Sequence, residues 1–246
     1  MKRLTPLLVA GVFGALLIAE RRRPLRRRRD SQPLRFAHNA AMAALTALVT
    51  APLQAALVRR ALRPGGSARP GPLPSAVKIL LLDYSLWWWH RLNHVWAPLW
   101  RFHSVHHADP DLDVSTGMRF HLGEMLPAAL FRAAQVRLLG VDRRTLEWWQ
   151  RMLLVSILFH HSNLRLPVRL ERQLVRVLVT PRMHGIHHSD VEEQANSNWA
   201  SVFSVWDSLH GTFVWDIPQE TIRIGVPRPR IPAPPAPDLP PRPSAE

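Results

Sequence analysis

The sequence contains no cysteine among its 246 residues. Disulfide bonds and metal sites built on thiolates are therefore excluded, and the composition is compatible with a reducing cytoplasm. Histidine, in contrast, occurs 13 times. The length suits one domain with a sizeable hydrophobic core.

Acidic residues are also scarce, with 18 Asp and Glu against 32 Lys and Arg, for a net charge of +14. A charge of this size is typical of proteins that contact nucleic acid or an anionic membrane face. We find no nucleic-acid-binding motif, and the arginines lie next to apolar stretches, as they do beside membrane spans. The sequence therefore favours a membrane and predicts no nucleic-acid partner.

Eight histidines fall into three clusters, spaced H-x-x-x-H, H-x-x-H-H and H-x-x-H-H. Residues three and four apart share a helix face, so each cluster can direct two or three imidazoles at one point. An isolated histidine usually binds no metal, but eight in this pattern exceed the four ligands of a single zinc ion and indicate two metal ions. The clusters are His90 and His94; His103, His106 and His107; and His184, His187 and His188.

Apolar segments separated by basic links predict an all-α integral-membrane protein with about four transmembrane helices. The expected spans are a helix at 4–19, a helix at 36–58, one that begins near Ala76, and a hairpin at 122–140 and 145–161. Residues 4–19 precede Glu20 and an arginine block rather than a cleavage site, so we expect a retained helix and not a signal peptide. The positive-inside rule places that arginine block in the cytoplasm.

This topology brings the histidine clusters to one side of the membrane, in a cytoplasmic helical cap that holds a histidine-rich di-metal site. We expect three parts: N-terminal membrane spans and a basic link at 1–75, a catalytic domain at 76–216, and a disordered proline-rich tail at 226–246. The basic segment 165–182 is expected to lie on the anionic leaflet. The predicted location is a bacterial inner membrane with the active site on the cytoplasmic side.

Further motifs accompany the clusters in order: F-H-H-S-N at 159–163, N-W at 198–199 and W-D-x-L-x-G-T-F at 206–213. With the clusters, they resemble the fatty acid hydroxylase and sterol desaturase superfamily of integral-membrane di-iron oxidases, over residues 76–216. The resemblance implies two iron ions held by His161 and the eight clustered histidines. It also implies O2-dependent hydroxylation or desaturation of a fatty acyl, sterol-like or ether lipid. Electrons would come from an external reductase with a ferredoxin or cytochrome.

Other polar residues are candidates for supporting roles. Asp83 lies seven residues before His90, on the same helix face, and is predicted to accept the free N–H of a ligating histidine. One of the neighbours His160 and His161 should point away, and His161 is preferred as the ligand because it matches the motif. Whether His160 or His121 is also a ligand is open, and His121 is equally a candidate supporting group or substrate contact. His210 is expected not to be a ligand, and His38 to lie at headgroup level. Similar supporting roles are predicted for Asn163, Asn198 and Asp207.

Two alternatives belong to other classes of protein. One is a non-catalytic membrane protein that binds or transports a divalent metal, which should place polar ligands near the bilayer midplane. The other is a zinc hydrolase, which needs a general base beside an open metal position. The histidine clusters lie at the ends of predicted spans and no H-E-x-x-H motif is present. Both observations favour the oxidase.

Overall fold

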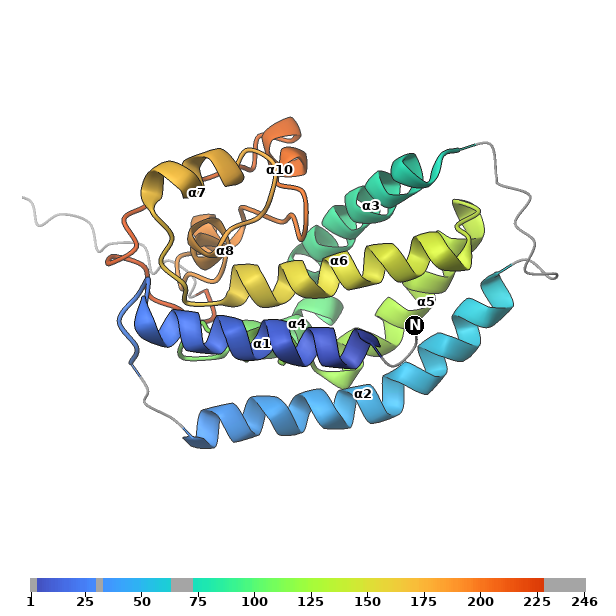
Figure 1. Cartoon of the computed structure of the whole chain (residues 1–246), viewed down its shortest axis with the longest axis horizontal. Coiled ribbons are helices and arrows are strands. Elements are labelled where there is room, and N and C mark those ends of the chain that lie inside the picture. Colours follow the sequence, from blue (N-terminus) through green and yellow to red (C-terminus); the bar gives the residue numbers. More distant parts are fainter. Residues whose placement is uncertain (1–3, 30–32, 63–72, 228–246) are drawn as a thin grey trace, which may run out of the picture.

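The computed structural model of the chain describes residues 4–29, 33–62 and 73–227, and this part of the chain is helical, without strands. Five long helices form the body of the molecule (Figure 1). They are α1 (Leu4–Arg22), α2 (Pro33–Ala61), α3 (Ser75–Val95), α5 (Leu122–Leu138) and α6 (Arg143–His161). Apart from its first two residues, the predicted tail at 226–246 lies outside the described residues, as does most of the basic link that ends the predicted 1–75 part.

Shorter helices complete the fold. Of these, α7, α8 and α10 gather at one end of the bundle (Figure 1), where α8 packs against α6. In the bundle, α2 packs on α5 and α1 on α6. The short helices are α4 (Ala97–His107), a 3₁₀ turn at Thr116–Met118, α7 (Val168–Leu174), α8 (Pro181–His187), α9 (Glu192–Ala195) and α10 (Val205–Leu209).

Local sequence explains where the helices begin and turn. Asp142 caps α6 by accepting the backbone N–H of Thr145 at 2.9 Å, which satisfies one of the free donors of the first turn. Between α3 and α4 the chain is extended at Trp96, and a proline follows within the first turn of α4, where its missing N–H costs nothing. This sharp break lets α4 fold back on α3 and face it.

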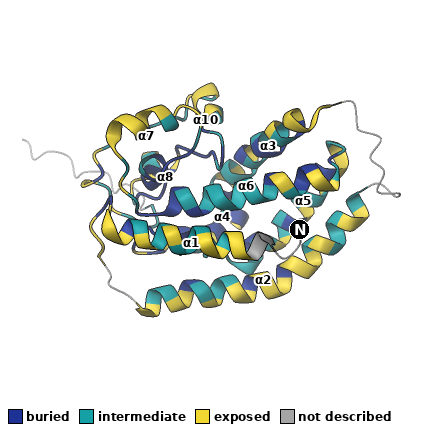
Figure 2. Ribbon diagram, viewed as in Figure 1, coloured by how far each residue is buried: buried dark blue, intermediate teal, exposed yellow. Residues whose placement is uncertain are grey.

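Two hydrophobic clusters join α3 to its neighbours. One packs Leu82 against α5 and α6 through Val136, Leu146 and Trp149. The other packs Trp87 against the short helices at the end of the bundle, and it also contains Val175, Val179, Met183, Trp199 and Ala200. Figure 2 shows that buried residues concentrate where α8 meets the ends of α4 and α6, so the best-protected part of the molecule is this end.

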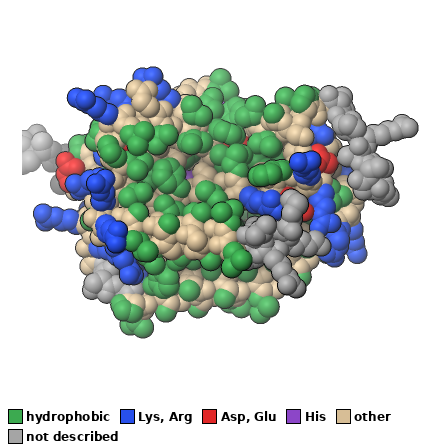
Figure 3. Space-filling view, viewed as in Figure 1, with side chains coloured by type: hydrophobic (Ala, Val, Ile, Leu, Met, Phe, Trp, Pro, Cys, Tyr) green, Lys and Arg blue, Asp and Glu red, His purple; other side chains and the backbone are tan. Residues whose placement is uncertain are grey.

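Among the described residues, α2 is the one helix long and apolar enough to cross a membrane, with a mean hydropathy of 1.8 over its best window. Its outward face carries large apolar side chains, such as Leu34 and Leu48, which are 81% and 76% exposed. Figure 3 shows hydrophobic side chains over the middle of one face and Lys and Arg gathered toward its two ends. The helix α6 carries four charged residues, Arg143, Arg144, Glu147 and Arg151, so its composition alone does not identify a span.

Candidate metal centre

Nine histidine side chains converge inside the molecule in two groups. Within each group, one ring nitrogen from every residue lies within 4.8 Å of those of the others. Four helices supply them: the end of α3, α4, the end of α6, and α8 with the residue that follows it. The first group is His90, His94, His103, His107 and His187, and the second is His106, His161, His184 and His188.

The two groups do not coincide with the three clusters in the sequence, because members of one cluster fall into different groups. His106 and His107 are neighbours in α4 but belong to different groups, because adjacent helical residues diverge by about 100°. His187 likewise belongs to the first group, and its neighbour His188 to the second. The structure thus brings together all nine residues predicted as ligands, in two sets that no single cluster defines.

The second group contains two ring nitrogens that face each other without a proton to share. His106 donates from Nδ1 to the carbonyl of Arg119 at 3.0 Å, and His161 from Nδ1 to the carbonyl of Ile157 at 2.8 Å. A neutral imidazole carries one N–H, so both Nε2 atoms are bare acceptors. These two atoms lie 3.0 Å apart. Such a pair needs a cation between its nitrogens.

The first group repeats this arrangement. His90 and His187 donate from Nδ1 to the carbonyls of Trp199 and Ser197 at 2.7 and 2.8 Å, and their Nε2 atoms face each other at 3.1 Å. Within the described part of the chain, three further buried Nε2 atoms have no hydrogen-bond partner. They belong to His94, His103 and His107.

Burial keeps a member of each facing pair neutral. Burial, followed by repulsion from neighbouring histidines, lowers the pKa of His106 and His187, and also of His184 and His188, well below the ordinary value of 6.5. A proton therefore does not fill the space between the facing nitrogens at neutral pH. Neutral imidazole is the form that binds a metal ion. The unpartnered nitrogens and their neutral state fit one metal ion in each group.

Glu124 supports the first group, and sequence reasoning missed it. Its carboxylate accepts the Nδ1 proton of His103 at 2.9 Å, and both residues are buried. A carboxylate in this position fixes the tautomer and strengthens the ring as a ligand. The signal in the sequence was its place three residues after His121, in the first turn of α5.

Asn198 acts through the backbone rather than by contacting a histidine. It has a φ of +56°, and its two neighbours, Ser197 and Trp199, supply the carbonyls that orient His187 and His90. Asparagine tolerates this left-handed conformation better than most residues. Its side chain donates to the carbonyls of Met183 and Val214, at 3.0 and 2.8 Å, which anchors the turn.

The carboxylate of Asp83 does not orient a histidine as predicted. It accepts from Trp206 Nε1 at 2.7 Å and from the backbone N–H of Phe203 at 3.1 Å. Asp83 shares a helix face with His90, as the spacing predicted. However, it lies two turns away from His90 along α3, beside α10. Its hydrogen bonds attach α3 to the residues around α10.

Asp207 does not make the predicted direct contact with a metal ligand, but bonds the backbone that orients one. It accepts the backbone N–H groups of Trp199 and Ala200, at 2.8 and 2.9 Å, and Nε1 of Trp87 at 2.9 Å. Burial raises the pKa of its carboxyl. Asp207 holds the peptide whose carbonyl orients His90, and so it acts on the first group through Trp199.

The remaining candidates lie outside both groups. His160 does not point away from its neighbour: its ring is buried next to the second group, with its centroid 4.6 Å from that of His161 and 4.1 Å from that of His184. His121 caps α5 by accepting from the backbone N–H of Gly123, and His210 lies 3.0 Å from the hydroxyl of Tyr84. His38 is exposed on α2.

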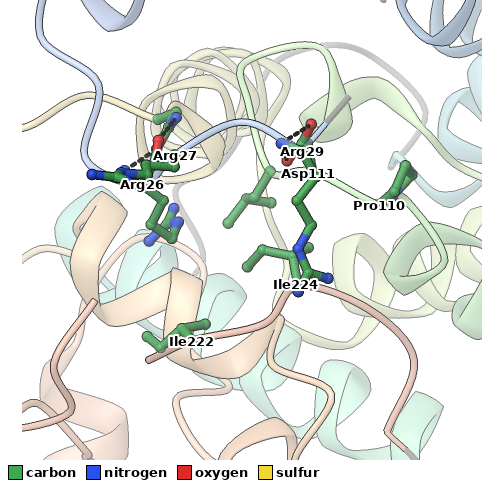
Figure 4. A pocket seen from close by; sticks show the side chains of 9 residues that line it. Arg26, Arg27, Arg29, Pro110, Asp111, Ile222 and Ile224 are labelled. Atoms are coloured by element: carbon green, nitrogen blue, oxygen red, sulfur yellow. Dashed lines mark hydrogen bonds between the residues drawn. The ribbon is translucent and has the colours of Figure 1, made fainter. Parts of the chain in front are cut away.

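Asn163 attaches the segment after α1 to the end of α6. Its side chain exchanges two hydrogen bonds with the backbone of Arg26, each 2.9 Å long. The guanidinium of Arg26 is buried against α8, where it lies over Gly185 and approaches the carbonyl of Pro181 at 3.3 Å. A small cavity of about 20 Å³ lies beside Arg26 and Arg29, and Figure 4 shows the Arg29 backbone bonded to Asp111 there.

A larger cavity of about 420 Å³ opens beside the first group. His94 lines it, and so do Arg91, Glu192 and Trp199. The second group has no member among its lining residues. The first group is therefore the one that a molecule from outside can reach through this cavity.

The sequence is similar to known proteins. Residues 75–212 match the family model described as fatty acid hydroxylase. An ornithine lipid hydroxylase OlsE from Rhizobium tropici is 31% identical over 148 residues, which are 58% of this chain and 44% of that protein. A cholesterol 25-hydroxylase-like protein from Danio rerio is 32% identical over 145 residues, covering 56% of this chain and 54% of that protein.

The alkylglycerol monooxygenase of Homo sapiens is 27% identical over 140 residues, 54% of this chain and 28% of that protein. This chain thus spans about half the length of these relatives or less. No solved structure matches it significantly. The family model covers more than half of the chain, including all nine converging histidines. The chain therefore belongs to the fatty acid hydroxylase family.

Proposed function

We propose that the protein is a membrane-bound di-iron enzyme that uses O2 to hydroxylate or desaturate a lipid. The observation that carries this proposal is the pair of histidine groups, each with bare nitrogens facing one another. Relatives named for ornithine lipid, alkylglycerol and cholesterol all act on lipids by name, which supports a lipid substrate here.

Iron supplies the redox chemistry that splits O2, and zinc has no such chemistry. In hydroxylation, one oxygen atom enters a C–H bond of the lipid and the other leaves as water, with two electrons and two protons consumed. In desaturation, two hydrogens leave the lipid and two waters form, with the same two electrons and two protons consumed. An external reductase with a ferredoxin or cytochrome supplies the electrons.

The residues of the chain have three tasks in this reaction. Nine imidazoles would hold the two ions, and backbone carbonyls and Glu124 fix the tautomers of five of them so that their bare nitrogens face inward. Asp207 and Asn198 hold the 197–200 segment that supplies two of those carbonyls. The cavity beside His94 gives a substrate access to the first group.

Four spans with the active site on the cytoplasmic side of a bacterial inner membrane form the proposed arrangement. The apolar face of α2 and the Lys and Arg side chains toward the ends of the molecule support it (Figure 3). Reporter fusions after residues 64–74 and at the tail test it. An external tail combined with an internal 21–35 segment would contradict a site on one side of the membrane.

The proposed function is tested by measuring the iron content of the protein, its O2 consumption and the change in membrane lipids. The purified protein should contain two irons per chain and consume O2 when supplied with a reductant and membrane lipids. Lipid profiling of a deletion strain should then reveal a missing hydroxylated or unsaturated lipid. A protein that binds divalent metal reversibly, with no O2 consumption and an unchanged lipid profile, would instead be a metal-binding or transport protein.

A further inference from the structure

The cavity beside the first histidine group carries polar side chains that the fold does not use. Arg91, Glu192 and Asn196 line it. Among the described residues, no ion pair or side-chain hydrogen bond engages any of these three. The guanidinium of Arg91 lies over the ring of Trp88, with its Cζ 5.6 Å from the ring centroid. A basic, an acidic and an amide group at one cavity therefore remain available to a ligand.

The size of the cavity suits part of a lipid. Its volume of about 420 Å³ lies within the range of roughly 300–1,000 Å³ found for small-molecule sites. At its inner wall lies His94, whose buried Nε2 has no hydrogen-bond partner within the described structure. A ligand in the cavity thus lies directly against the first group.

An apolar strip begins at the same cavity. Trp88, Leu92 and Val95 occupy one face of the last turns of α3, and Trp96 follows them. Their exposed fractions are 44%, 40%, 60% and 53%, respectively. Val95 also lines the cavity, so the apolar strip and the polar cavity form one continuous surface.

We propose that this surface binds a lipid with a zwitterionic headgroup, with the headgroup in the cavity and the acyl chain along the strip. Arg91 pairs with the anionic group of the lipid, and Glu192 with its ammonium group. Asn196, in the same lining, offers a donor and an acceptor. The inference rests on the proposed function, because it names the class of lipid that the first histidine group meets.

Native mass spectrometry of the full-length, metal-loaded protein tests this assignment without turnover. Three probe lipids with identical acyl chains are compared: phosphatidylethanolamine, which carries both charges, phosphatidylglycerol, which carries only the negative charge, and uncharged diacylglycerol. The variants are Arg91→Gln and Glu192→Gln. Arg143→Gln and Glu147→Gln are matched controls, because these side chains form an exposed ion pair at the start of α6.

The unaltered protein should bind phosphatidylethanolamine most tightly. Arg91→Gln should weaken binding of both charged lipids by about tenfold or more, because a charge-assisted hydrogen bond is lost. Glu192→Gln should weaken phosphatidylethanolamine alone and bring its affinity to that of phosphatidylglycerol. The controls should bind as the unaltered protein does, and all four variants should retain their metal, since none of these residues is a ligand.

Equal affinities for the three lipids, or variants that behave like their controls, would overturn the proposal. An unchanged preference for phosphatidylethanolamine in Glu192→Gln would overturn the zwitterionic assignment. Failure of the proposed function is separable from these results. A protein that shows the preference but oxidises no lipid counts against the oxidase alone, and one that oxidises a lipid without the preference counts against the cavity alone.

Discussion

The Nε2 atoms of His106 and His161 lie 3.0 Å apart, and neither carries a proton, because each ring donates from Nδ1 to a backbone carbonyl. Two acceptors at this distance repel each other unless a cation lies between them. The same geometry recurs between His90 and His187. The chain thus maintains two sites that are electrostatically unfavourable when they hold neither metal nor proton.

Loss of one ligand should abolish oxidation. His106→Ala or His187→Ala should each eliminate activity and lower the metal content by up to one equivalent per chain, measured by elemental analysis. The protein should stay folded in the membrane, because its long helices satisfy their own backbone hydrogen bonds. His210→Ala and His38→Ala are the controls and should have mild effects, since neither residue belongs to a histidine group. Full activity in His106→Ala would refute the di-metal assignment.

Glu124 should affect metal affinity more than folding. Glu124→Gln keeps the size of the side chain but removes the charge that strengthens His103 as a ligand. We expect metal affinity to fall by about 10- to 100-fold, as is usual for such partners, in a competition titration with a chelator. Glu147→Gln, on the exposed side of α6, is the matched control. Equal affinities in the two variants would show that the Glu124 contact has no influence on the metal.

The backbone conformation of Asn198 should matter more than its side chain for orienting His90 and His187. Asn198→Ala places an alanine at a φ of +56° and also loses two hydrogen bonds. Asn198→Gly loses the same bonds but adopts this φ without strain. We therefore expect the glycine variant to be more stable than the alanine variant by about 1 kcal/mol, measured by thermal unfolding. If alanine is tolerated better than glycine, the left-handed turn is not what this position requires.

Gly185 and Arg26 should be energetically coupled. A Cβ at Gly185 would lie 2.0 Å from Nη1 of Arg26, so Gly185→Ala forces the buried guanidinium to move. We expect this substitution to destabilise the protein by about 1–3 kcal/mol, as overpacking does, and to cost less when Arg26→Ala is also present. A double-mutant cycle measures the difference. Additive effects would show that the guanidinium moves aside freely.

The local sequence pattern was enough to predict the positions of the long helices and of the histidine clusters. The spacing of the histidines on helices, the hairpin at 122–161 and the break at G-V-D-R-R follow from interactions between residues close in the chain, and the helices lie where these signals indicate. The resemblance added His161 to the eight clustered histidines. The structure brings these nine side chains together because each cluster is carried on a short stretch of helix or at its end.

Tertiary packing decided which residues from different helices share a group and what supports them. His187 joins residues of α3 and α4, and His188 joins His161 of α6, because four helix ends meet there at angles that spacing along the chain does not reveal. Asp83 has the correct periodicity for His90, yet it bonds Trp206, since α10 packs at its level. Glu124 and the carbonyls of Ser197 and Trp199 are distant in sequence from the rings they orient. Contacts of this kind depend on three-dimensional proximity, which the order of residues does not encode locally.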